Sequence, residues 1–152
     1  METMTDLKDE TVAGLKKLVR MNYDASKGYA DAAERISCDG CESVFRTAGE
    51  TRERFAAELK SALRMSDEDV PDGGSALGLF HRCWLNVRSA LNGGDEEVVL
   101  TEAIRGESAL VEEYEEVLVD TAGSPLNATL QRHITSVRAT RDSLESLKES
   151  RS

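Results

Sequence analysis

The stretch Ser75–Leu91, SALGLFHRCWLNVRSAL, decides the fold that we expect for this chain. It contains the single Trp and lies between two pairs of longer helical patterns, so it has to connect one pair to the other. Apolar residues recur in it at helical spacing and line one face of a helix. They are Leu77, Phe80, Trp84, Val87 and Leu91. The pattern predicts a short helix that lies across a helical bundle, with Trp84 as its anchor.

The segments on either side of this stretch predict two helical hairpins. Within each pair only a short turn separates the two apolar patterns, so the paired helices should be antiparallel neighbours. Asp95 is a suitable N-cap for the third long helix, and Ser124-Pro125 is a typical start for the fourth. The four long helices are expected over residues 7–37, 42–65, 95–123 and 125–149. Two hairpins joined by a long crossover form the connectivity of ferritin-like four-helix bundles.

Composition supports an all-α chain with one domain over residues 1–152. Only 2 residues are Pro and 5% are aromatic, which favours helix over sheet. The net charge of −10 argues against nucleic acid and anionic membranes as partners. The first residues lack the apolar region of a signal peptide, and no apolar run has membrane-spanning length. We therefore expect a cytoplasmic protein.

A di-metal carboxylate centre is the first activity to test for a bundle of this kind. Such a centre takes one inward Glu from each of two helices and a Glu-x-x-His motif from each of the other two. The chain has only His81 and His133, and the residues three positions earlier are Gly78 and Leu130. Because the ligands are missing, we expect no metal and no other cofactor.

Glu107 and Arg141 each interrupt the apolar face of a long helix. The turn between the last two helices places position 107 opposite about 138, within one helical turn of Arg141. A lone buried charge costs several kcal/mol, so we expect these two side chains to pair. The pair is either a structural ion pair that fixes the helix register or the altered remnant of a ligand layer.

Three cysteines provide candidate thiols at Cys38, Cys41 and Cys83. An odd number fits a reducing compartment, so we expect Cys38 and Cys41 to be reduced. Their Cys-x-x-Cys spacing is also that of redox motifs, and a zinc site would need two further ligands, for which His81 and Cys83 are the available source. Inert thiols, a redox pair and a metal site therefore remain as three alternatives.

The cluster His81-Arg82-x-Trp84 has two interpretations. As a packing device it would bury Trp84 and let His81 or Arg82 bind carbonyl groups at a helix end. Alternatively, the same cluster would mark a binding site.

These motifs carry a family resemblance. Gly78, His81, Arg82 and Trp84 form Gly-x-x-His-Arg-x-Trp, and an Arg-Gly-Glu motif ending at Glu107 follows. The chain resembles an uncharacterised bacterial ferritin-like domain family that has these motifs, over about residues 7–148. Many relatives carry a Glu near the position of Ser26 and a His near Arg141, and this chain has neither. The resemblance implies a ferritin-like bundle with an extra crossing helix and no established activity.

We therefore expect a non-enzymatic ferritin-like bundle without a di-iron site, acting as an interaction module or in a stress-associated role. Its partner would be an unknown protein or a second copy of the chain. The alternative is a metal-binding or oxidoreductase member of the ferritin-like superfamily.

Overall fold

The computed structural model describes residues 9–64 and 75–150. All regular secondary structure in these two ranges is helical, which confirms the all-α prediction. The helices are α1 (Asp9–Arg35), α2 (Cys41–Leu63), α3 (Ser75–Gly93), α4 (Glu96–Asp120) and α5 (Pro125–Ser150). Each predicted helix is present, and within the described ranges its ends differ from the prediction by a few residues at most. The predicted helix residues 7, 8 and 65 lie outside these ranges.

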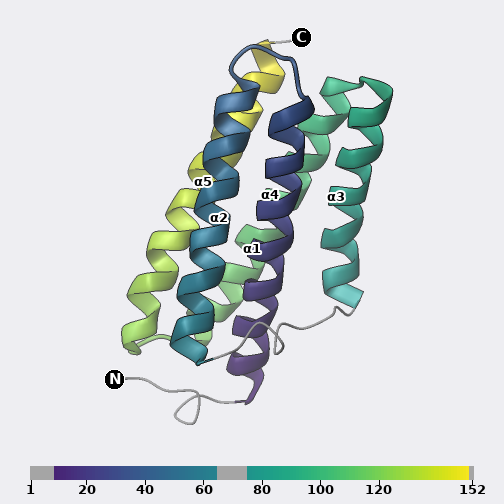
Figure 1. The fold of residues 1–152 in the computed structure, drawn as a ribbon. Coiled ribbons are helices and arrows are strands. Elements are labelled where there is room, and N and C mark those ends of the chain that lie inside the picture. Colours follow the sequence, from purple (N-terminus) through teal and green to yellow (C-terminus); the bar gives the residue numbers. More distant parts are fainter. Residues whose placement is uncertain (1–8, 65–74, 151–152) are drawn as a thin grey trace.

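The helices form two antiparallel pairs, α1 with α2 and α4 with α5 (Figure 1). In that view α1, α3 and α5 run from bottom to top, and α2 and α4 run from top to bottom. Because α3 covers the distance from the end of α2 to the start of α4, these two helices run in the same direction. This is the chain path that a crossover between two hairpins produces.

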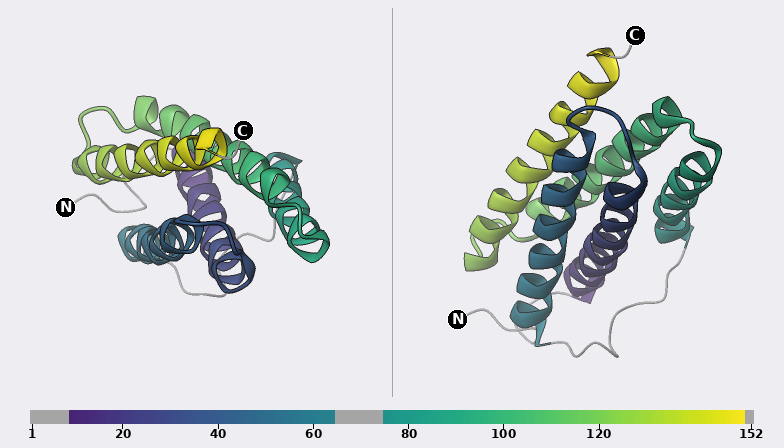
Figure 2. Two further views of the ribbon diagram at one scale, coloured as in Figure 1. Left: turned by 90° about the horizontal axis from the view of Figure 1, so that it is seen from above. Right: turned by 45° about the horizontal axis from the view of Figure 1, so that its top comes forward.

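The orientation of α3 corrects the prediction of a short helix lying across the bundle. It has 19 residues, which corresponds to a length of about 28 Å. It runs lengthwise beside α1 and α4 and packs against both (Figures 1 and 2). The physical reason is that α2 ends and α4 begins at opposite ends of the bundle, so their connector has to travel its full length.

Local sequence explains where several helices begin. The Asp95 carboxylate accepts a hydrogen bond from the backbone amide of Val98 (3.2 Å), as an N-cap does. The Ser124 hydroxyl accepts one from the amide of Leu126 (3.1 Å), at the start of α5. Gly40 precedes α2 with φ at 81°, a left-handed conformation that glycine adopts at little cost.

The core lies where the apolar faces of all five helices meet. Phe80, Trp84 and Val87 of α3 are 1%, 7% and 1% exposed, so the predicted apolar face of this helix is buried. Leu91 is partly buried against the same core, and the side chain of Leu77 lies outside the described residues. None of the described helices is long and apolar enough to cross a membrane.

Candidate functional site

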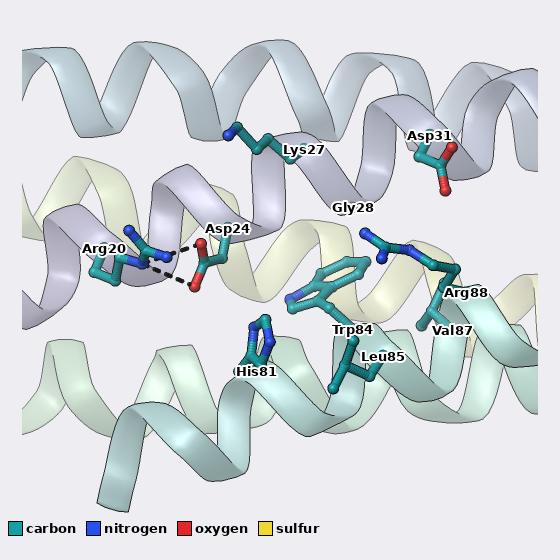
Figure 3. A pocket seen from close by; sticks show the side chains of 10 residues that line it. All are labelled: Arg20, Asp24, Lys27, Gly28, Asp31, His81, Trp84, Leu85, Val87 and Arg88. Carbon is teal, nitrogen blue, oxygen red and sulfur yellow. Dashed lines mark hydrogen bonds and ion pairs between the residues drawn. The ribbon is translucent and has the colours of Figure 1, made fainter. Parts of the chain in front are cut away.

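A pocket of about 210 Å³ opens between α1 and α3 (Figure 3). The ion pair between Arg20 and Asp24 closes one end of it, with Nε and Oδ1 3.2 Å apart. Burial raises the pKa of Asp24, against the opposing effects of Arg20 and His81. The pocket is lined by Arg20, Asp24, Lys27, Gly28, Asp31, His81, Trp84, Leu85, Val87 and Arg88. Its wall therefore combines both signs of charge with an indole ring.

The motif residues His81 and Arg82 are both exposed on α3. His81 lines the pocket, whereas Arg82 does not. The burial that the packing interpretation predicts is found at Trp84, which is 7% exposed.

Trp84 packs where three helices meet. A Cβ atom placed on Gly28 of α1 would overlap the indole ring, approaching Cδ2 to 2.7 Å, and one on Gly106 of α4 would lie 3.7 Å from Nε1. The ring also makes an edge contact with Tyr29, with the ring centroids 4.7 Å apart. These two glycines therefore allow α1 and α4 to approach the Trp84 ring closely. By contrast, a Cβ on Gly78 would meet nothing within 4 Å.

A buried ion pair lies inside the bundle. Nη2 of Arg52 on α2 donates to Oε2 of Glu107 on α4 at 2.7 Å, and the two side chains are 0% and 1% exposed. The Tyr29 hydroxyl of α1 donates to the other carboxylate oxygen, also at 2.7 Å. Both oxygens of the Glu107 carboxylate thus have a donor, and three helices meet at this residue.

The pairing of Glu107 with Arg141 was predicted wrongly. Glu107 is buried and bound to a guanidinium as expected, but its partner is Arg52, and Arg141 is partly exposed on α5. The turn between α4 and α5 determines only which residues of these two helices lie at the same level. An inward side chain of α4 also faces α1 and α2, and Glu107 points to these two helices.

A second polar chain links the core to the surface. The Asn22 amide Nδ2 donates to the Tyr114 hydroxyl (2.9 Å), and this hydroxyl lies 2.8 Å from His133 Nδ1. His133 Nε2 is 2.7 Å from Oε1 of Glu58, which is 32% exposed. Since a carboxylate accepts, a neutral His133 donates from Nε2 and accepts from Tyr114 at Nδ1. The chain thus begins at Asn22, inside the bundle, and ends at the partly exposed Glu58.

Burial and charge shift the pKa values of these groups in different directions. Burial raises the pKa of Tyr29, and the neighbouring Glu107 carboxylate raises it further. Burial lowers the pKa of His133 to about 4, although Glu58 opposes this shift. Burial acts to raise the pKa of Glu58, but hydrogen bonds from His133 and Arg132 outweigh it and the pKa is lowered. The His133 ring is therefore neutral near pH 7.

The predicted reduced state of Cys38 and Cys41 is corrected, because the structure joins them in a disulfide. The turn between α1 and α2 brings their Cα atoms to 5.4 Å, within the range that disulfides require. Cys83 is the free thiol of the described residues and is buried on α3. Burial raises its pKa.

The described parts of the chain contain no group of three or more His, Cys, Asp or Glu residues that could hold a metal ion. The proposed zinc set of the two paired cysteines with His81 and Cys83 is therefore not assembled. A family model for a domain of unknown function, DUF2383, matches residues 10–120, well over half of the chain. The chain belongs to the DUF2383 family. No curated protein and no solved structure matches it.

The DUF2383 match covers α1 to α4 and ends where α4 ends. Within it lie Trp84, the two glycines that pack against its ring, and the Arg52–Glu107 pair. His133 lies on α5, beyond the matched residues. The polar chain from Asn22 to Glu58 therefore depends on a residue outside the matched region.

Sequence reasoning on this DUF2383 chain missed Arg52 and His133, although a signal was present for both. Arg52 lies four residues after Ala48 and three before Phe55, on the apolar face of α2. His133 lies three residues after Leu130, on the apolar face of α5. A polar residue at an apolar position of the helical period indicates a buried polar group, which needs a partner.

Proposed function

We propose that this DUF2383 chain is a non-enzymatic, ferritin-like helical bundle without a di-iron centre and that it acts as an interaction module. The chain path supports the ferritin-like assignment, since two antiparallel hairpins are joined by a crossover that runs the length of the bundle. The Arg52–Glu107 ion pair is the observation that carries the proposal.

The residues inside the bundle do not fit a di-iron centre. A guanidinium lies next to Glu107, the more deeply buried of the two buried Glu residues of α4, and a cation there opposes a second cation. The Glu-x-x-His motifs that a centre of this type needs on two helices are absent, and buried positions of α2 and α5 carry Arg52-x-x-Phe55 and Leu130-x-x-His133 instead. Both ring nitrogens of His133 already have partners. The side chains that remain free to bind metal inside the described bundle are too few to hold two metal ions.

Metal analysis of the chain purified without added metal tests the first part of the proposal. We expect iron, manganese and zinc well below one atom per chain, and no rise in the unfolding midpoint when Fe²⁺ or Mn²⁺ is added. The Glu107→Gln variant is the control for specific binding. Stoichiometric metal in the wild type that is lost in this variant would instead support the metal-binding or oxidoreductase alternative.

The pocket between α1 and α3 is the contact site that we assign to the interaction module. His81 and Arg88 line it and are exposed on α3, so their side chains are available to a protein partner or a second copy. We expect His81→Glu with Arg88→Glu to weaken pull-down of the partner or self-association in light scattering. Arg141→Glu, a charge reversal on α5, is the matched control and should leave both unchanged. Equal effects of the two variants would argue against this site.

A further inference from the structure

The turn between α1 and α2 leaves Cys38 partly exposed and buries Cys41, the other residue of the disulfide. Cys38 is partly exposed and lines a surface groove of about 400 Å³ with Asp39, Leu147 and Ser150. Cys41 is 0% exposed and belongs to the hydrophobic core. The Cys38 side of the disulfide is therefore the side that is open to an external thiol.

The turn has supports that do not depend on the sulfur–sulfur bond. The backbone amide of Cys41 donates to the carbonyl of Cys38 at 3.1 Å, and that of Val44 donates to the carbonyl of Gly40 at 3.3 Å. The left-handed conformation of Gly40 closes the turn at little cost. The bond can consequently open while the two cysteines stay close together.

The start of α2 can stabilise a thiolate at Cys41. Cys41 is the first residue of the helix, and the N-cap, Gly40, provides no side-chain acceptor for the amides of the first turn. These amides and the helix dipole favour negative charge at this position. Helix N-termini lower the pKa of cysteine thiols in the same way. Burial opposes a thiolate at Cys41 as it does at Cys83, but the start of α2 offsets this at Cys41 alone, so Cys41 is the leaving group when an external thiol reacts at Cys38.

We propose that Cys38 and Cys41 form a reversible dithiol–disulfide pair that exchanges with a low-molecular-weight thiol through Cys38. The thiolate of the small molecule attacks the Cys38 sulfur, a mixed disulfide forms, and Cys41 leaves as a thiolate that then takes a proton. A second small thiolate attacks the small-molecule sulfur of the mixed disulfide and releases Cys38. Two small thiols are thereby oxidised to one disulfide, and the protein pair is reduced to two thiols. This activity goes beyond the proposed interaction role.

Cys83 is an internal reference for the exchange. It is 4% exposed, and burial disfavours its thiolate, so it should not react in the folded protein. Selective reaction at the turn can thus be measured within one molecule.

Equilibration of the wild-type chain with glutathione buffers of varied redox ratio, followed by rapid alkylation and peptide mass spectrometry, tests the pair. We expect Cys38 and Cys41 to change together from disulfide to dithiol while Cys83 stays unmodified and the helical circular dichroism is unchanged. A pair that stays in one state at every ratio, or opens only when the helices unfold, would overturn the proposal.

Two variants in a Cys83→Ala background test the role of each sulfur. We expect Cys41→Ser, which leaves Cys38 free, to form a mixed disulfide with oxidised glutathione about tenfold faster or more than Cys38→Ser. Circular dichroism of each variant checks that it is folded. Equal rates, or faster reaction of Cys38→Ser, would refute the assignment of Cys38 as the exchanging sulfur. If either variant does not fold, mapping the glutathione adduct on the wild type decides the same point, because it should lie on Cys38.

Discussion

Nη2 of Arg52 and Oε2 of Glu107 lie 2.7 Å apart inside the bundle, with both side chains at most 1% exposed. Burial acts to lower the pKa of Arg52, but the Glu107 carboxylate more than offsets this and the pKa is raised. The pair is therefore charged, and it links α2 to α4, two helices from different hairpins.

Removing one partner of this pair should destabilise the fold strongly. Glu107→Gln or Arg52→Met leaves the other charge buried and unpaired, and each should cost about 3–5 kcal/mol of unfolding free energy. The double variant should cost less than the sum of the two, because no charge is left unpaired. Urea denaturation of the full cycle measures this. Arg141→Met is the control and should change stability little, while strictly additive effects would contradict the coupling.

The fit of Trp84 against α1 predicts opposite effects at two glycines. Gly28→Ala places a methyl group against the buried indole ring and should destabilise the fold by about 1–3 kcal/mol. Gly78→Ala meets no atom within 4 Å and should be neutral or stabilise by up to about 1 kcal/mol, through helix propensity alone. Thermal and urea unfolding of the two variants compares them. An equal gain in stability at both positions would show that the ring is not held against Gly28.

Acid should destabilise the protein through His133. Its pKa is lowered from 6.5 to about 4, so between these values the unfolded chain binds more protons than the folded one. The contribution of the neutral His133 to the free energy of unfolding is complete above pH 6.5 and is lost as the pH falls towards 4. Between pH 7 and pH 5 the loss from this group should be about 2 kcal/mol. Urea denaturation at both pH values measures it.

The two histidines of the chain provide a matched pair for this experiment. His133→Gln should remove most of the loss between pH 7 and pH 5, whereas His81→Gln should keep it, because His81 is exposed. If both variants retain the pH dependence of the wild type, another group is responsible for it.

Tyr114 joins Asn22 to His133, and removing its hydroxyl should leave Nδ1 of His133 without a donor and take away one of the two acceptors of Asn22 Nδ2, which keeps its bond to the Leu18 carbonyl. Tyr114→Phe keeps the ring that makes an edge contact with His133, yet should cost about 1–3 kcal/mol for the buried polar groups that lose their hydrogen bonds. Tyr23→Phe is the control, since Tyr23 is 37% exposed, and should change stability by less than about 0.5 kcal/mol. Equal stability of the two variants would mean that the hydrogen bonds of Tyr114 contribute nothing to the free energy of unfolding.

Local patterns along the sequence determined the helices of this protein and which faces they bury. The five helices lie where apolar residues recur at helical spacing, and Asp95 and Ser124 cap the helices that they were expected to cap. The burial of Trp84 and Glu107 also follows from the same periodicity. These features are predictable because they depend on residues a few positions apart.

Only the tertiary structure decided which residues meet. The periodicity turns Glu107 inward, but an inward side chain of α4 faces three other helices, and packing selects Arg52 of α2 over Arg141 of α5. The lengthwise course of α3 likewise follows from where α2 ends and α4 begins, which no pattern within Ser75–Gly93 records. The physical reason is that helical periodicity specifies a face, whereas the partner on that face depends on the arrangement of helices distant in sequence.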